Sequence, residues 1–142
     1  MINQFWISRD KIKGLFHSVP SISLTCDLWT SPNTKAILAM TAHWVNIDYE
    51  LKEILLDALE IRGAHTGVNI ATNLLITLEE FSIKGKLFCV TGDNASNNKT
   101  MAREIEKLVV GFKADNNLLG CAGHVWLGIR RWIECSWLCC KR

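Results

Sequence analysis

Three extended segments follow one another between residues 21 and 61, separated by short turns, and this run constrains the fold more than any other feature. Residues 21–29 alternate between apolar side chains such as Cys26 and polar ones such as Asp27, which is typical of a half-buried strand. Residues 36–45 form a second extended, apolar run. Strands that are joined by such short turns pair in antiparallel fashion, so we predict a three-stranded meander.

The rest of the chain adds helices and further strands to this meander. The predicted segments, in order, are a helix at residues 1–18, strands at 21–29, 36–45 and 52–61, a helix at 65–81, a strand at 87–91, a helix at 98–109, and a short strand or helix start at 118–127. Propensity allows residues 52–61 to be strand or helix, and we interpret them as a strand because turns flank them. The apolar faces predicted for the helices include Phe5, Ile12, Leu15 and Phe16, then Val68, Ala71, Leu75 and Leu78, then Met101, Ile105 and Leu108.

The order of these segments predicts an α/β fold, in which a mixed sheet is flanked by helices. A helix between the third and fourth strands suggests a crossover that returns the chain to a parallel strand. The fourth strand would then lie beside a central first strand. This β-β-β-α-β-α order is that of the first half of an RNase H-like fold.

The composition is that of a globular protein and narrows the classes of partner. The chain has 142 residues, which suit one domain, and its 49% of hydrophobic residues can fill a core. A net charge of +2 does not by itself indicate nucleic-acid binding. We find neither a secretory signal nor an apolar run near the ~20 residues of a membrane span, so we expect no membrane partner and reduced cysteine thiols.

Two aspartates are candidates for chemistry. Asp27 lies on the polar face of the first predicted strand, and Asp93 directly follows the fourth. They are 66 residues apart (93 − 27 = 66), but pairing of those strands would bring them together. Paired carboxylates bind Mg²⁺, and two such ions ~3.5–4 Å apart can catalyse phosphoryl transfer. An aspartate at a strand end also commonly caps a turn or helix, and the residues alone favour that structural role.

Further polar residues lie close to these positions in the sequence. Asn94, Asn97 and Asn98 follow Asp93, and asparagines in such a run usually form a turn or cap a helix. Cys121 and His124 have the C-x-x-H spacing that can serve zinc, but no recognisable pattern supplies two more ligands. We favour a buried or hydrogen-bonded Cys–His pair, with a structural zinc site as the alternative.

Five short blocks occur in order across about residues 21–127. They are residues 27–31 (DLWTS), 41–44 (TAHW), 63–67 (GAHTG), 91–98 (TGDNASNN) and 121–124 (CAGH). Together they resemble the blocks of the hobo/Activator-type (hAT) DNA transposases and of their zinc-finger BED relatives. Each block alone is modest, whereas their joint appearance is specific.

The resemblance implies a partial RNase H-like catalytic domain in which Asp27 and Asp93 are catalytic, metal-binding carboxylates. It implies Mg²⁺ or Mn²⁺ as the cofactor, terminal-inverted-repeat DNA as the partner, and the nucleus as the location. A homo-oligomer is expected only of a full-length form. The resemblance further implies that Cys121 and His124, together with Asn94 and Asn98, support the active centre or the DNA.

The chain also departs from this family. The third carboxylate of the family is a glutamate far downstream, and Glu134 lies too early to replace it. The BED zinc finger and the dimerisation region are also missing. We therefore expect a leading segment at residues 1–20, a partial catalytic domain at 21–127, and a divergent tail at 128–142 that reflects a frameshift or read-through.

These observations lead to three hypotheses about function. The first is a truncated hAT-type transposase catalytic domain that is inactive by itself. The alternative is a domesticated, transposase-derived module that binds DNA or assembles without catalysis, although a near-neutral charge weighs against strong DNA binding. The third is a compact nuclease that takes its third ligand from Glu104, from Asp115 or from another subunit.

Overall fold

The computed structural model describes residues 2–31, 35–93 and 96–121, with the side chains of the first helix described from Arg9 onward. The elements are α1 (Ile2–Phe16), β1 (Ile22–Thr30), β2 (Ala36–Val45), β3 (Leu51–Ile61), α2 (Gly67–Glu80), the 3₁₀ turn η1 (Lys84–Lys86), β4 (Leu87–Gly92), α3 (Ser96–Leu108), α4 (Ala114–Asn117) and β5 (Leu118–Gly120). The predicted order is confirmed, and the ambiguous residues 52–61 do form a strand. The short helix α4 was not predicted.

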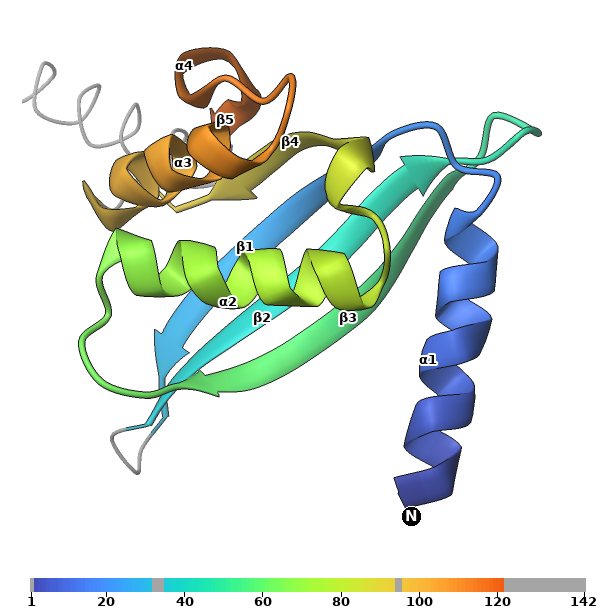
Figure 1. Cartoon of the computed structure of the whole chain (residues 1–142), viewed down its shortest axis with the longest axis horizontal. Coiled ribbons are helices and arrows are strands. Elements are labelled where there is room, and N and C mark those ends of the chain that lie inside the picture. Colours follow the sequence, from blue (N-terminus) through green and yellow to red (C-terminus); the bar gives the residue numbers. More distant parts are fainter. Residues whose placement is uncertain (1, 32–34, 94–95, 122–142) are drawn as a thin grey trace, which may run out of the picture.

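The five strands form one sheet in the order β3-β2-β1-β4-β5 (Figure 1). β1 pairs with β2, and β2 with β3, in the antiparallel sense that the short turns require. β1 pairs with β4, and β4 with β5, in the parallel sense, because a helix connects each new strand to the one before it. The predicted mixed sheet, with a central first strand beside the fourth, is confirmed.

Helices α2 and α3 pack on one face of the sheet, and the core lies between them and the strands (Figure 1). Along β1, Leu24 and Cys26 are buried on this covered face, whereas Thr25 and Asp27 are exposed on the other. This alternation follows from the pleat of a strand, which directs successive side chains to opposite faces. The largest fully buried side chains are Phe16, Phe81, Phe112, Ile22, Leu24, Leu38, Met40, Leu74, Leu78, Ile83, Met101 and Ile105.

The apolar faces of the helices differ in part from those predicted. Leu108 on α3 is about half exposed, so its predicted burial is wrong. Leu15 on α1 and Val68 on α2, which were predicted to lie on apolar faces, are also about half exposed. All three lie in the first or last turn of a helix, where an apolar residue can extend past the sheet that the middle of the helix covers. In α2, burial is instead completed by Ile70 and Leu74.

Helix α1 packs against the same core. The Phe16 ring is 1% exposed and meets the Trp44 ring edge-on, with 5.3 Å between ring centroids. Arg9 forms ion pairs with Asp57 on β3, at 3.6 Å, and with Glu80 at the end of α2. The leading segment therefore contributes to the core of the sheet.

No helix in the described ranges is both long enough and apolar enough to cross a membrane. Three cysteines lie among the described residues: Cys26 and Cys89 are free thiols buried within strands, and Cys121 directly follows β5. The other three cysteines of the chain lie outside the described residues.

Candidate active site

Asp27 lies near the end of β1, on the face of the sheet opposite α2 and α3, which we call the open face. Its side chain is exposed, whereas the preceding Cys26 is buried. Its cross-strand neighbour on β2 is Ala39, whose small side chain leaves the carboxylate accessible. Burial, together with the smaller effect of the adjacent Asp27 charge, raises the pKa of the Cys26 thiol to about 12.

Asp93 comes directly after β4, and the pairing of β4 with β1 carries it toward Asp27. In the parallel ladder Thr25 is the partner of Thr91, an offset of 66 residues (91 − 25 = 66). Asp27 and Asp93 each lie two residues beyond this last recorded pair, with Asp93 just past the end of β4. Adjacent strands lie ~4.8 Å apart, so this register brings the two carboxylates to one end of the sheet.

Asn98, in the first turn of α3, holds Asp93. Its Nδ2 donates a hydrogen bond to a carboxylate oxygen of Asp93 at 2.7 Å and another to the Asp93 carbonyl oxygen. Gly92 permits this approach, because a Cβ at that position would lie 2.7 Å from the same nitrogen. Asn98 is thus a positioning residue for Asp93. Its residue type alone had suggested only a turn or a helix cap. Asn94 lies outside the described residues.

Cys121 directly follows β5, the strand that pairs with β4. Gly92 of β4 is the partner of Gly120 in β5, and the backbone N–H of Cys121 donates to the Gly92 carbonyl at 2.8 Å. Cys121 therefore follows β5 as Asp93 follows β4, and it is half-buried. The C-x-x-H block thus begins one strand away from Asp93 and two strands away from Asp27, while His124 lies outside the described residues.

The donor set at this end of the sheet suits a hard divalent cation. Mg²⁺ prefers carboxylate oxygens and keeps several waters, and the exposure of Asp27 and Asp93 leaves room for them. The described part of the chain contains no cluster of three His, Cys, Asp or Glu side chains that could hold a metal ion together.

The acidic residues considered as a third ligand lie elsewhere. Glu104 accepts a 2.6 Å hydrogen bond from Lys107 within α3. Asp115 lies in the first turn of α4, where it lines a separate hollow beside α3. Within the described ranges, neither residue joins the two aspartates in a three-ligand group.

A hydrogen-bonded chain across the open face was not predicted. Thr25 Oγ1 and His43 Nε2 are 2.9 Å apart, and His43 Nδ1 lies 3.5 Å from a carboxylate oxygen of Glu53. The three residues come from β1, β2 and β3, and Thr25 is two residues before Asp27 on the same face. Alternation in the sequence could place each residue on this face, but it carries no information on the register between the strands.

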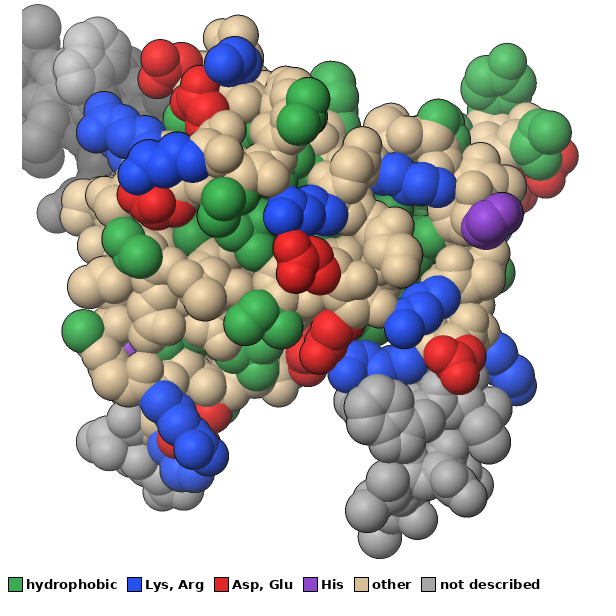
Figure 2. Space-filling model, in the orientation of Figure 1, with side chains coloured by type: hydrophobic (Ala, Val, Ile, Leu, Met, Phe, Trp, Pro, Cys, Tyr) green, Lys and Arg blue, Asp and Glu red, His purple; other side chains and the backbone are tan. Residues whose placement is uncertain are grey.

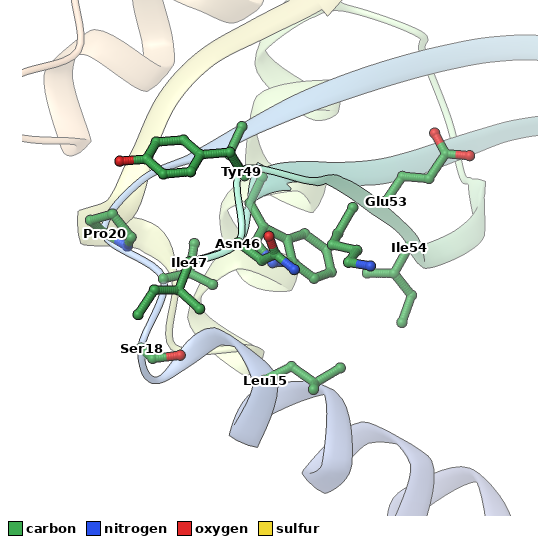
Figure 3. A pocket seen from close by; sticks show the side chains of 12 residues that line it. Leu15, Ser18, Pro20, Asn46, Ile47, Tyr49, Glu53 and Ile54 are labelled. Carbon is green, nitrogen blue, oxygen red and sulfur yellow. The ribbon is translucent and has the colours of Figure 1, made fainter.

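An open hollow lies at the end of the sheet where β1 begins (Figure 3), whereas the two aspartates lie where β1 and β4 end. Its volume is about 830 Å³, and it is bounded by the end of α1, the turn after β2 and the start of β3. Leu15, Ile47 and Tyr49 are among its mainly apolar lining residues. It contains neither aspartate and is not part of the candidate active site.

Comparison with known proteins matches the chain to one family. The family model of the ZBED1 RNase-like domain matches residues 25–122, which include both aspartates. A putative transcriptional regulator, tpeD, of Talaromyces stipitatus is 32% identical over 108 residues, and a putative AC transposase of Zea mays is 31% identical over 98 residues. The zinc finger BED domain-containing protein RICESLEEPER 3 of Oryza sativa is 24% identical over 87 residues.

These relatives are much longer than the chain. The matches cover 73%, 68% and 61% of this chain, in the order given, but only 13%, 12% and 12% of the relatives. The chain therefore spans about an eighth of the length of the curated relatives that it matches. The likeness concerns the RNase-like domain and does not extend to the other parts of those proteins.

Proposed function

Because the chain belongs to the hAT-type transposase-related family, we propose that it is a partial transposase catalytic domain, with two of three catalytic carboxylates and no strand cleavage by itself. The observation that carries the proposal is the register between β1 and β4. The same 66-residue offset that pairs Thr25 with Thr91 relates Asp27 to Asp93. This register carries both carboxylates to the same end of the sheet.

Asp27 and Asp93 would hold Mg²⁺ or Mn²⁺. When bound, the ion activates the attacking oxygen and stabilises the leaving oxygen of a phosphoryl transfer. Asn98 keeps the Asp93 carboxylate oriented through its 2.7 Å hydrogen bond. With only two protein carboxylates a second ion is poorly held, and this is the physical reason for the proposed inactivity.

The proposed substrate is DNA, and the proposed place of action is the nucleus. Relatives named as a transposase, as BED zinc-finger proteins and as a transcriptional regulator support both parts of this proposal. The exposed position of Asp27 on the open face leaves the carboxylate accessible to a large substrate. Terminal inverted repeats are the specific DNA that we propose for the parent transposase.

A domesticated binding module is the second candidate function. One relative carries the name of a putative transcriptional regulator, which favours a role without catalysis in part of the family. The two candidates differ in whether the aspartates bind metal. In a module without catalysis, Asp27 and Asp93 are free to lose metal binding while the fold is kept.

Calorimetric titration of Mg²⁺ and Mn²⁺ into the full chain tests the proposal. The variants are Asp27→Asn and Asp93→Asn, which remove a charge but keep the shape of the side chain. We expect each to weaken metal binding at least about tenfold, because each removes one of two ligands. Asp10→Asn, on the exposed surface of α1, removes the same charge far from the site and should bind metal like the wild type.

Two results would contradict the proposal. Absence of metal binding by the folded wild-type chain would favour the domesticated module. Metal-dependent nicking of plasmid DNA that both aspartate substitutions abolish would instead show a complete active site, and would contradict the proposed inactivity. Circular dichroism of every variant separates either result from loss of the fold.

A further inference from the structure

A small hollow lies between α3, α4 and β5, beside the strand that leads to Asp93. Its volume is about 250 Å³, and its lining includes Lys99 and Arg103 from α3 and Asp115 from α4. Lys99 directly follows Asn98, the residue that holds Asp93. The hollow is therefore close to the candidate active site but separate from its carboxylates.

Lys99 and Arg103 form no ion pair with the other described residues. Both side chains are exposed, and in the described part of the chain no carboxylate oxygen lies within 4.0 Å of their charged nitrogens. Lys107 and Lys113, farther along, are instead paired with glutamates. Even with Asp115 counted, the hollow keeps a net positive charge of one (2 − 1 = 1).

The helix termini add to this positive potential. α2 and α3 begin against each other, since a Cβ on Gly67 would lie 2.4 Å from the Asn97 carbonyl oxygen. Neither helix has an acidic residue in its first turn. Each N-terminus carries about half a positive charge, which normally disfavours a nearby lysine. Lys99 nevertheless occupies this region, so the site concentrates positive charge against local preference.

The geometry points to the exposed side of α3 as a surface that binds the phosphodiester backbone of DNA, with Lys99 and Arg103 as phosphate contacts. This inference rests on the proposed function, since it supplies a contact that would hold DNA at the end of the sheet where Asp93 leads into α3. The two cations are one helical turn apart, about 6 Å along the axis. Figure 2 shows basic side chains over α3, with acidic side chains among them, on the face of the molecule that this view presents.

Anisotropy of a labelled short DNA duplex, titrated with the full chain, tests the surface. The double variant Lys99→Gln/Arg103→Gln should weaken binding at least about fivefold at ~0.1 M salt. The plot of log affinity against log salt should become shallower by about 2, because two phosphate contacts are lost. Lys99→Arg/Arg103→Lys, which keeps both charges, should bind within about twofold of the wild type.

The matched control is Lys11→Gln/Lys13→Gln, which removes the same charge from exposed positions on α1. An equal loss in this control would overturn the inference, since bulk charge would then explain the binding. Absence of DNA binding by the wild type would also overturn it. Metal titration separates the two proposals. If the wild type binds metal and the Lys99→Gln/Arg103→Gln variant binds DNA as the wild type does, the α3 surface alone is refuted. If the wild type binds no metal but the same double variant loses DNA affinity, the catalytic proposal alone is refuted.

Discussion

Cys26 and Asp27 are neighbours in the chain, yet the pleat of β1 gives them opposite environments. Asp27 faces water on the open face, while Cys26 is 8% exposed and packs in the core. Burial is the main reason that the pKa of Cys26 rises from its ordinary value of 9.0 to about 12, and the negative charge of Asp27 adds to it. A thiol in this setting is a packing residue, because only the thiolate is an effective nucleophile.

We expect Cys26 to resist alkylation by iodoacetamide in the folded protein at about pH 8.5, while the half-buried Cys121 reacts first. Timed alkylation followed by peptide mapping in a mass spectrometer measures both rates. Between pH 9.0 and about 12 the Cys26 thiol is deprotonated in the unfolded state but still protonated in the folded state. The contribution of Cys26 to the free energy of unfolding is therefore complete below pH 9.0 and is lost as the pH rises toward about 12. Equal alkylation rates for the two thiols at pH 8.5 would contradict this assignment.

At the scale of the elements, a close contact between the N-termini of α2 and α3 fixes the position of α3 beside the end of β4. A Cβ on Gly67 would lie 2.4 Å from the Asn97 carbonyl oxygen and 2.6 Å from the Met101 nitrogen. Both atoms belong to the backbone of α3, so neither can move without displacing the helix. The Asn97 side chain adds a 2.8 Å hydrogen bond to the His65 carbonyl, just before α2.

We expect Gly67→Ala to lower the free energy of unfolding by about 1–3 kcal/mol, because the added methyl group forces the two helices apart. Gly85→Ala is the matched control, since a Cβ there meets nothing within 4 Å. Its effect should stay within about 0.5 kcal/mol. Denaturant unfolding of both variants checks the difference, and equal stabilities would show that α2 and α3 do not meet as closely as described.

The whole molecule has two unlike sheet faces. The covered face is closed by helices, whereas exposed apolar side chains on the open face include Trp29, Leu51 and Leu55. Leu51 and Leu55 belong to β3, the edge strand on that side of the sheet. Exposed apolar surface on an edge strand favours association between chains.

We expect Leu55→Thr to reduce concentration-dependent self-association of the chain, because it replaces an exposed apolar side chain on the edge strand with a polar one that also suits a strand. Light scattering over a concentration series measures the effect. Val110→Thr, in the exposed turn after α3, removes a comparable apolar group away from the open face and should leave association unchanged. An equal decrease in both variants would show that the open face is not the associating surface.

The sequence by itself determined the order of the elements, the α/β class and the two strand-end aspartates, because alternation, helical periodicity and turn residues are local properties. The register between β1 and β4, the Asn98 bond to Asp93, the chain from Thr25 through His43 to Glu53, and the exposure of Val68 and Leu108 were decided only by the tertiary structure. Each depends on how distant segments slide or rotate against one another as the core packs, and no local pattern encodes that.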